Sequence, residues 1–317
     1  MSGYTVIDQI WQMSLRAYCD NFFSYQSELV PGAFYEIMSW CTCSRIMTDV
    51  GNDAFAPYPP RTSGVTAMST SAAIIELNVP IAMRDGVKLY ADIFRPNTDG
   101  ECPVILQRTP YGKRSEPALS TLLAVENGYA VVLQDVRGRY ASEGNFDTFV
   151  NEAHDGYGTV EWIAEQAWSN GKIGMIGGSY AGAIQWLSAS EKPPHLTAIF
   201  PSVTTSEYHE GWTYQGGVFQ LGFNTSWGIR LAAAGANHLS EGLGFPDERV
   251  TQLTSAVDNI AEEFWTLPLD QQHHISALTS PYFFDWLNHP MEDGFWSSIR
   301  IEDKHDDIQT PAYNLGG

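Results

Sequence analysis

Short apolar runs of strand length alternate with stretches of helical spacing in the middle of this chain. The apolar runs are residues 104–106, 129–133, 173–176 and 196–200. Strands separated by helices of roughly ten to fifteen residues are typical of a parallel sheet that carries helices on both faces. The alternation therefore predicts a fold of the α/β class.

The segment before the first of these runs predicts a β-hairpin. Residues 74–79 and 87–94 both alternate between apolar and polar side chains, which is the period of a half-buried strand. Asp85 and Gly86 stand between them and form a dipeptide that favours a tight turn. We expect this hairpin to begin the sheet.

Changes of composition divide the chain into four expected segments. Residues 1–72 combine two short amphipathic helical patterns with a stretch rich in Pro, Ser, Thr and Gly, and predict an N-terminal appendage and linker. Residues 73–201 are the first part of the α/β core. Residues 202–307, rich in Trp, Phe, Gly and acidic residues, predict a helical cap. Residues 308–317 predict the start of a returning core strand.

Charge and composition exclude several classes of function. Seventeen Lys plus Arg against 37 Asp plus Glu give a net charge of −20, which disfavours nucleic acid and anionic membranes as partners. A hydrophobic content of 44% excludes disorder of the whole chain. The four cysteines lack the spacing of a zinc site or a disulfide scaffold, so we expect structural thiols. With neither a signal sequence nor a membrane-spanning run visible, we expect a cytoplasmic protein.

One motif carries nucleophile chemistry. The residues 177–182, Gly-Gly-Ser-Tyr-Ala-Gly, lie between a predicted strand and a predicted helix. A tight strand-to-helix turn can hold Ser179 exposed, and the helix N-terminus behind it offers N–H groups to a developing oxyanion. Ala181 departs from the common G-x-S-x-G pattern, in which a second glycine stands there. The alternative is an ordinary strand-to-helix turn without catalytic function.

From about residue 78 to 317 the chain resembles the first half of the cocaine-esterase-like (CocE/NonD) and X-Pro dipeptidyl-peptidase family of α/β-hydrolases. The resemblance is carried by separated motifs in the family's order. They are residues 83–89 (MRDGVKL), 108–111 (RTPY), 134–138 (QDVRG) with 142–144 (SEG), 177–182 read as G-x-S-Y-x-G, and 285–290 (DWLNHP) with Asp293, Phe295 and Trp296. The family tolerates a residue other than glycine at the position of Ala181. The resemblance implies an α/β-hydrolase fold with a mostly parallel sheet, helices on both faces and a helical cap.

The same resemblance assigns roles to individual residues. It implies that Ser179 is the nucleophile, and that the backbone N–H of Tyr180 and the phenol of Tyr111 are the oxyanion donors. The alternative for Tyr111 is a loop aromatic that packs on the cap. The family uses neither a metal nor an organic cofactor. Gly158 stands where the family often has an Asp, and we expect this difference to affect only local helix stability.

A serine nucleophile also needs a base and an acid that orients it. Residues 310–317 resemble the family strand that precedes the triad acid, so the chain is expected to be truncated before the triad Asp and His, with negligible turnover. None of the eight histidines present has the expected strand-to-loop context. The alternative from another class is a catalytically inactive, truncated hydrolase that acts as an interaction protein.

The substrate is expected to be a small ester or peptide, with esterase and X-Pro dipeptidyl-peptidase activity both left open. Between residues 257 and 309 there are eleven acids against two basic residues. The acids are Asp258, Glu262, Glu263, Asp270, Asp285, Glu292, Asp293, Glu302, Asp303, Asp306 and Asp307. This excess has two interpretations: a field that favours substrates with a free ammonium group, or a solubilising surface.

Overall fold

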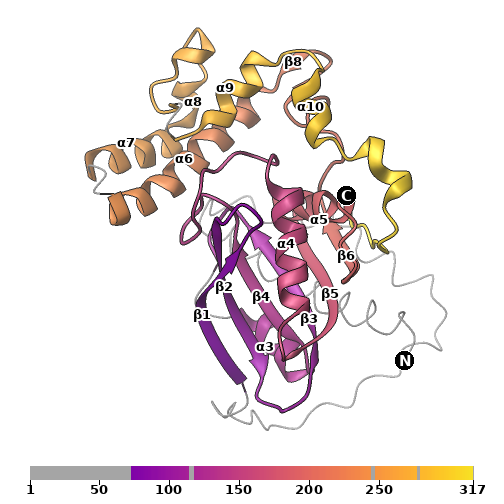
Figure 1. Ribbon diagram of the computed structural model, residues 1–317. Coiled ribbons are helices and arrows are strands. Elements are labelled where there is room, and N and C mark those ends of the chain that lie inside the picture. The colour runs from indigo at the N-terminus through magenta and orange to yellow at the C-terminus, as the bar shows by residue number, and fades with distance from the viewer. Residues whose placement is uncertain (1–72, 114–117, 244–246, 277–278, 317) are drawn as a thin grey trace, which may run out of the picture. The chain divides into compact units, whose positions relative to one another are not determined.

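The computed structural model describes residues 73–113, 118–243, 247–276 and 279–316 (Figure 1). The chain divides after residue 72, and the second unit, Ala73–Gly317, holds all of the described residues. The appendage and linker expected in residues 1–72 therefore lie outside the described part, as do three of the four cysteines. Cys102 is buried and unpaired by a disulfide, and its thiol donates to the Trp168 carbonyl at 3.3 Å.

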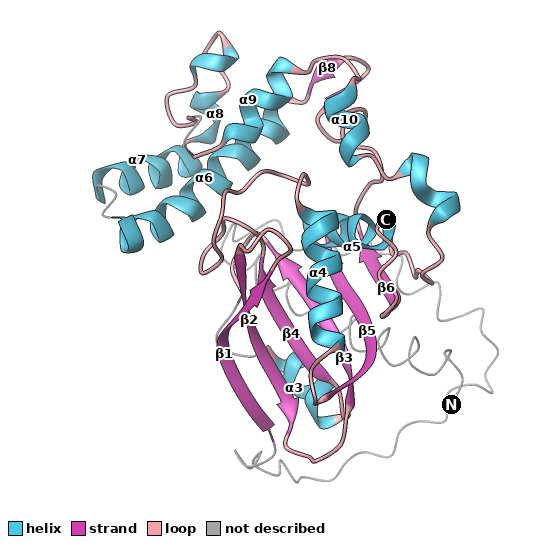
Figure 2. Cartoon of the chain, viewed as in Figure 1, coloured by secondary structure: helices cyan, strands magenta, loops and turns pink. Residues whose placement is uncertain are grey.

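A six-stranded sheet forms the centre of this unit (Figure 2). Its strands, in spatial order, are β1 (Ala73–Ala82), β2 (Lys88–Pro96), β4 (Ala130–Asp135), β3 (Cys102–Thr109), β5 (Ser169–Gly178) and β6 (Leu196–Ser202). The β1/β2 hairpin and the β2/β4 pair are antiparallel, whereas β4, β3, β5 and β6 run parallel. The predicted α/β fold with a mostly parallel sheet is confirmed.

The last described residues continue the sheet beyond β6. The backbone N–H of Ile199 donates to the Pro311 carbonyl at 2.9 Å, and that of Val203 donates to the Leu315 carbonyl at 2.8 Å. Parallel bridges join the same two stretches of chain. Residues 311–315 therefore lie in extended form along β6.

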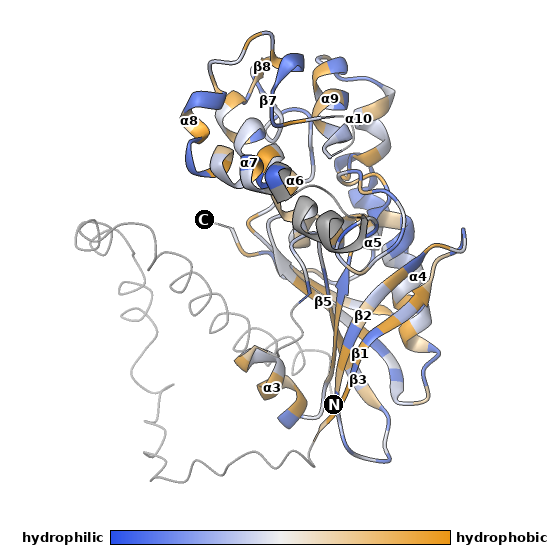
Figure 3. Ribbon diagram, turned by 90° about the vertical axis from the view of Figure 1, so that its left-hand side faces the viewer, coloured by the Kyte–Doolittle hydropathy of each residue, from blue (hydrophilic) through white to orange (hydrophobic). Residues whose placement is uncertain are grey.

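Helices cover both faces of the sheet. Helix α3 (Leu119–Glu126) lies on one face, and α4 (Glu152–Ala164) and α5 (Tyr180–Ser190) lie on the other (Figure 3). Helices α4 and α5 pack closely because Gly156 faces Ser188: a Cβ on Gly156 would lie 1.8 Å from the Ser188 Oγ. Gly158 faces Met83, whose Sδ would lie 3.3 Å from an added Cβ, so its small size has a packing reason.

The mainly helical region between β6 and the final extended segment, called the cap below, lies at one end of the sheet (Figure 1). Its elements are β7 (Tyr214–Gln215), β8 (Val218–Phe219), α6 (Leu221–Leu243), α7 (Asp247–Asp258), α8 (Ile260–Glu263), the 3-10 helix η2 (Leu269–Gln271), α9 (Pro281–Asn288), α10 (Gly294–Ile299) and the 3-10 helix η3 (Glu302–Asp307). The small β7/β8 hairpin, which turns at Gly216 and Gly217, was not predicted. None of the described helices is long and apolar enough to cross a membrane.

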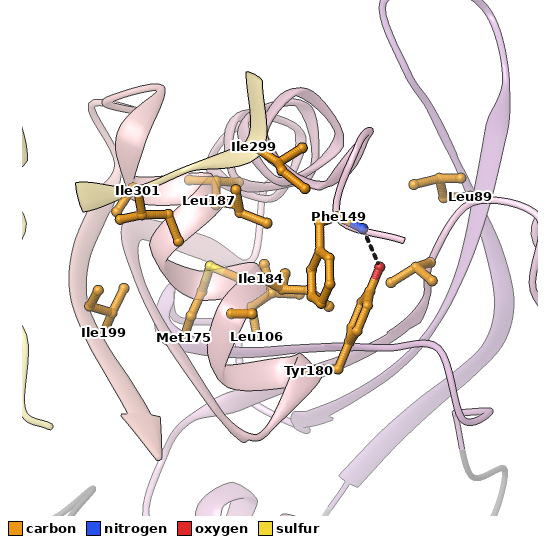
Figure 4. Packing of buried hydrophobic residues seen from close by; sticks show 14 of the residues in the cluster. Leu89, Leu106, Phe149, Met175, Tyr180, Ile184, Leu187, Ile199, Ile299 and Ile301 are labelled. Carbon is orange, nitrogen blue, oxygen red and sulfur yellow. Dashed lines mark hydrogen bonds between the residues drawn. The ribbon is translucent and has the colours of Figure 1, made fainter. Parts of the chain in front are cut away.

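The core lies between the sheet and helices α4 and α5 and extends to the cap. Apolar side chains of β3, β5, α5 and the segment around α10 meet there, among them Leu106, Met175, Ile184 and Ile299 (Figure 4). Strand β5 begins at Ser169, although Ser169 and the dipeptide Asn170-Gly171 are residue types that favour a turn. Pairing of Ser169 with Cys102 of β3 extends the strand through these residues, with a shift of register afterwards.

Candidate active site

Ser179 stands at the point where β5 ends and α5 begins. Its backbone has φ 55° and ψ −122°, outside the regions that side chains ordinarily favour. The residue is exposed, although Tyr180, which follows it, is fully buried in the core. The local geometry therefore presents a serine hydroxyl to solvent on a sharply turned backbone, as a nucleophile elbow requires.

Small residues permit this turn. Gly177 has φ 143°, and a Cβ added there would lie 2.6 Å from the Cβ of Ala181. The two positions face each other across the turn, so glycine at the first leaves room for one methyl group at the second. This contact explains why Ala181 is compatible with the elbow. The Ser179 N–H donates to the Ser202 carbonyl at 2.9 Å, which ties the turn to β6.

The N-terminus of α5 lies directly behind the serine. Tyr180 is the first residue of this helix, and the first N–H groups of a helix have no acceptor within it. The helix dipole adds favourable sign for a negative charge at this end. A backbone donor is thus available next to Ser179, where a tetrahedral oxyanion would develop.

The side chain of Tyr180, the residue after Ser179, holds the turn in place through buried contacts. It is fully buried and stacks on Phe149 with ring centroids 4.7 Å apart. Its hydroxyl accepts from the Phe149 N–H at 2.9 Å (Figure 4) and donates to Glu152 Oε1 at 3.0 Å. Burial, followed by the Glu152 charge, holds the pKa of Tyr180 well above its usual value, so this phenol stays protonated.

Glu152 in turn faces a buried arginine. Arg108 Nη2 lies 3.0 Å from Glu152 Oε2, and neither side chain is more than 4% exposed. Arg108 also donates to Gln134 Oε1 at 2.7 Å and to the Glu152 carbonyl at 3.1 Å. Burial raises the pKa of Glu152, while the Arg108 charge opposes that rise. No pattern in the sequence indicates that Glu152 supports the turn at Ser179 through Tyr180.

Tyr111 follows the carboxyl end of β3, which pairs in parallel with β5. Because neighbouring parallel strands end at the same edge of a sheet, Tyr111 and Ser179 follow adjacent strand ends. The Tyr111 side chain is about half exposed, and its hydroxyl accepts from Trp227 Nε1 of α6 at 3.3 Å. The Trp227 ring lies 6.0 Å from that of Tyr180. Tyr111 therefore contacts the helical region through Trp227, whose ring also lies near that of Tyr180.

Most of the described histidines lie against groups other than Ser179. His154, His195, His274 and His289 each lie within ion-pair distance of a carboxylate, and His209 Nε2 lies 3.1 Å from the Pro290 carbonyl. Within the described ranges, none of them is hydrogen-bonded to the Ser179 hydroxyl. Among the residues that the structure describes, no base is therefore hydrogen-bonded to the Ser179 hydroxyl.

Some of the acidic residues of the cap are paired, and one faces a carboxylate of the core. Arg300 pairs with Glu292 and Asp303, whereas Asp147 of the loop before α4 lies near Asp285 of α9. Burial, followed by the Asp285 charge, raises the pKa of Asp147 to about 6. Its buried Oδ1 has no hydrogen-bond partner among the described residues. The sequence analysis did not single out Asp147.

Comparison with known proteins gives consistent results. The family model described as X-Pro dipeptidyl-peptidase (S15 family) matches residues 85–317. The cocaine esterase of Rhodococcus sp. (strain MB1 Bresler) is 36% identical over 247 residues, which cover 76% of this chain and 43% of that protein. The chain thus spans less than half the length of this relative.

Solved structures show the same likeness. A CocE/NonD family hydrolase from Staphylococcus aureus superposes with a TM-score of 0.57 and 28% identity, over 75% of this chain and 40% of the other. An α-amino acid ester hydrolase superposes with a TM-score of 0.55 and 24% identity, over 83% and 46% of the two chains, which shows a shared fold. From the elbow geometry, the sheet and these matches, the chain belongs to the CocE/NonD and X-Pro dipeptidyl-peptidase (S15) family of α/β-hydrolases.

Proposed function

We propose that the chain carries the nucleophile and oxyanion donors of a serine hydrolase that cleaves ester or amide bonds. The observation that carries the proposal is the exposed Ser179 in a strained turn between β5 and α5. Strain of this kind persists only where the surrounding structure holds it, and it gathers at functional sites. Here the hydrogen bond from the Tyr180 hydroxyl to Glu152 and the buried ion pair of Glu152 with Arg108 supply that structure.

The chemistry follows from the positions of three groups. The Ser179 Oγ attacks the carbonyl carbon of the substrate, and the carbonyl π electrons move to the oxygen. The Tyr180 N–H and the Tyr111 hydroxyl donate hydrogen bonds to that oxyanion, and one such donor contributes about 3 kcal/mol to lowering the barrier. Collapse of the intermediate expels the alcohol or amine and leaves the acyl group on Ser179, from which water releases it.

The proton of Ser179 must pass to a base during the attack, and the expelled group must receive a proton. Within the described ranges, no base or acid is hydrogen-bonded to the Ser179 hydroxyl. The proposal therefore assigns neither proton transfer to a particular residue. The proposal therefore concerns the acylation step. A reactive electrophile tests this step, because it modifies the serine without needing the binding contacts of a particular substrate.

Carboxylic esters are the first substrate class that we propose. The support is the 36% identity to a protein named for its esterase activity. The dipeptide amide suggested by the name of the matching family model is the competing class. A panel of chromogenic esters compared with an X-Pro dipeptide anilide separates them, because faster release from the anilide would contradict the ester assignment.

Covalent labelling tests the proposal itself. A fluorophosphonate reacts with a serine that a base activates, and the proposal requires such a base although the described residues show none hydrogen-bonded to Ser179. We therefore expect modification of the wild-type chain at Ser179, in contrast to the negligible turnover expected from the sequence, and no modification of Ser179→Ala. Ser298→Ala, which removes an exposed serine of α10, serves as the matched control and should label like the wild type. Tyr111→Phe should slow labelling by about 100-fold or more, the loss typical of one oxyanion donor.

A wild-type chain that stays unlabelled would contradict the proposal. That result would favour the alternative of an inactive hydrolase fold that serves as an interaction protein. Equal labelling of Ser179→Ala and wild type would also contradict it, since the reactive group would then lie elsewhere.

A further inference from the structure

Arg139 is a buried cation that joins the core to the cap. It lies in the loop after β4 and is 3% exposed, and its hydrogen-bond acceptors among the described residues are backbone carbonyls rather than carboxylates. Its Nε donates to the Pro110 carbonyl at 2.9 Å, and its Nη1 donates to the Leu231 carbonyl of α6 at 3.0 Å. The guanidinium lies 5.0 Å from the centroid of the Phe146 ring. Two backbone carbonyls from distant parts of the chain thus share one side chain.

Helix α6 has a glycine where the Arg139 guanidinium packs against it. Gly235 lies one turn after Leu231, and a Cβ added there would come within 2.9 Å of Arg139 Nη1. By contrast, Gly222 of the same helix has nothing within 4 Å of an added Cβ. Glycine at 235 therefore leaves the space that the Arg139 side chain occupies.

The carbonyl that Arg139 holds belongs to the residue before Tyr111. On the other side of Tyr111, the Lys113 N–H donates to Asp135 Oδ1 at 2.6 Å, and the Lys113 Nζ lies 3.3 Å from Asp135 Oδ2. Pro110, before Tyr111, is thus held by Arg139, which also binds the cap. Lys113, after Tyr111, is held by Asp135 of the core. Arg139 therefore links α6 to the Pro110 side of this segment.

We propose that Arg139 is a positioning residue that couples the placement of Tyr111 to helix α6 of the cap. Its effect on reactivity rests on the proposed function, because it acts through the Tyr111 hydroxyl and touches no reacting atom. The planar guanidinium suits this task, since it can donate in two directions at once. When α6 is packed on the sheet, the hydrogen bond from Arg139 fixes the position of the Pro110 carbonyl. The backbone direction after β3, and with it the placement of Tyr111, is then also fixed.

The first test needs no catalysis. The Tyr111 N–H is hydrogen-bonded to Thr109 Oγ1 at 3.1 Å, so its exchange with deuterium reports on the segment. We expect Arg139→Met and Gly235→Ala to speed exchange at Tyr111 about tenfold and to leave the elbow peptide, residues 177–183, unchanged. Gly222→Ala, the same change in the same helix, should leave both rates at the wild-type value.

The second test asks whether Arg139 acts through Tyr111. Displacement of a positioned group by about 1 Å can cost roughly 100-fold in rate. We expect Arg139→Met and Gly235→Ala to slow fluorophosphonate labelling of Ser179 by 10- to 100-fold, with Arg139→Lys intermediate because an ammonium is a compact donor rather than a fork. In a Tyr111→Phe background, Arg139→Met should cause no further loss, since the group that it positions is gone.

The outcomes separate this inference from the proposed function. Unchanged exchange at Tyr111 in Gly235→Ala and Arg139→Met would overturn the coupling, and so would an undiminished effect of Arg139→Met in the Tyr111→Phe background. An unlabelled wild-type chain would contradict the hydrolase assignment, while the exchange measurement would still decide the coupling. If Arg139→Met does not fold, Gly235→Ala keeps the test, because it retains the arginine.

Discussion

Replacement of Gly177 by alanine tests the elbow through its backbone. At φ 143° a residue with a Cβ is strained by roughly 1–3 kcal/mol. The added Cβ would also lie 2.6 Å from the Ala181 Cβ, and overpacking of this kind costs about 1–3 kcal/mol. We therefore expect Gly177→Ala to lower the free energy of unfolding by about 4 kcal/mol, measured by urea denaturation.

Two further variants separate strain from overlap. Gly178→Ala is the matched control, because its Cβ would overlap the Ser202 Oγ, at 2.8 Å, which can rotate away, and would lie at an ordinary contact distance of 3.5 Å from the Ser202 carbonyl oxygen. We expect a loss of about 1 kcal/mol. Ala181→Gly removes the facing methyl group. The double variant Gly177→Ala, Ala181→Gly should therefore be more stable than the sum of the two single losses predicts, by about 1–3 kcal/mol.

The reasoning fails if Gly177→Ala is no more destabilising than Gly178→Ala. It also fails if the losses in the cycle add to within about 0.5 kcal/mol, because the two positions would then not be in contact across the turn.

Two other variants probe buried charges. Glu152→Gln leaves Arg108 without its counter-charge and should lower the free energy of unfolding by about 3 kcal/mol in urea denaturation at neutral pH; an unchanged midpoint would contradict the ion pair. The pKa of Asp147 is raised to about 6, so the folded state binds its proton more tightly than the unfolded state and stability falls as pH rises from about 4 to 6. Because Asp147 is only partly buried, we expect Asp147→Asn to be more stable than wild type by about 1 kcal/mol at pH 7, with no difference at pH 4. An equal difference at both pH values would exclude titration of Asp147 as the cause.

Local patterns in the sequence predicted most of the core. Strands and helices around the elbow follow from apolar periodicity, and the first hairpin follows from Asp85 and Gly86 at its turn. The start of β5 at Ser169 was missed because it depends on pairing with Cys102, a partner 67 residues earlier in the chain. A turn-forming dipeptide cannot reveal such pairing.

The candidate site divides in the same way. Ser179 was predicted because its motif is local, and the elbow lies within six consecutive residues. The contact of Arg139 with the Leu231 carbonyl joins residues 92 positions apart, and that of Arg108 with the Glu152 carbonyl joins residues 44 apart. These contacts depend on how the cap and α4 pack on the sheet. Residue types alone do not determine that packing.

A crystal structure of the chain after reaction with a fluorophosphonate tests the central claim most directly. We predict phosphorus bonded to the Ser179 Oγ, with the phosphoryl oxygen about 2.7–3.1 Å from both the Tyr180 nitrogen and the Tyr111 hydroxyl. A phosphoryl oxygen that points into solvent, or a Tyr111 hydroxyl that is directed only at the cap, would contradict the account.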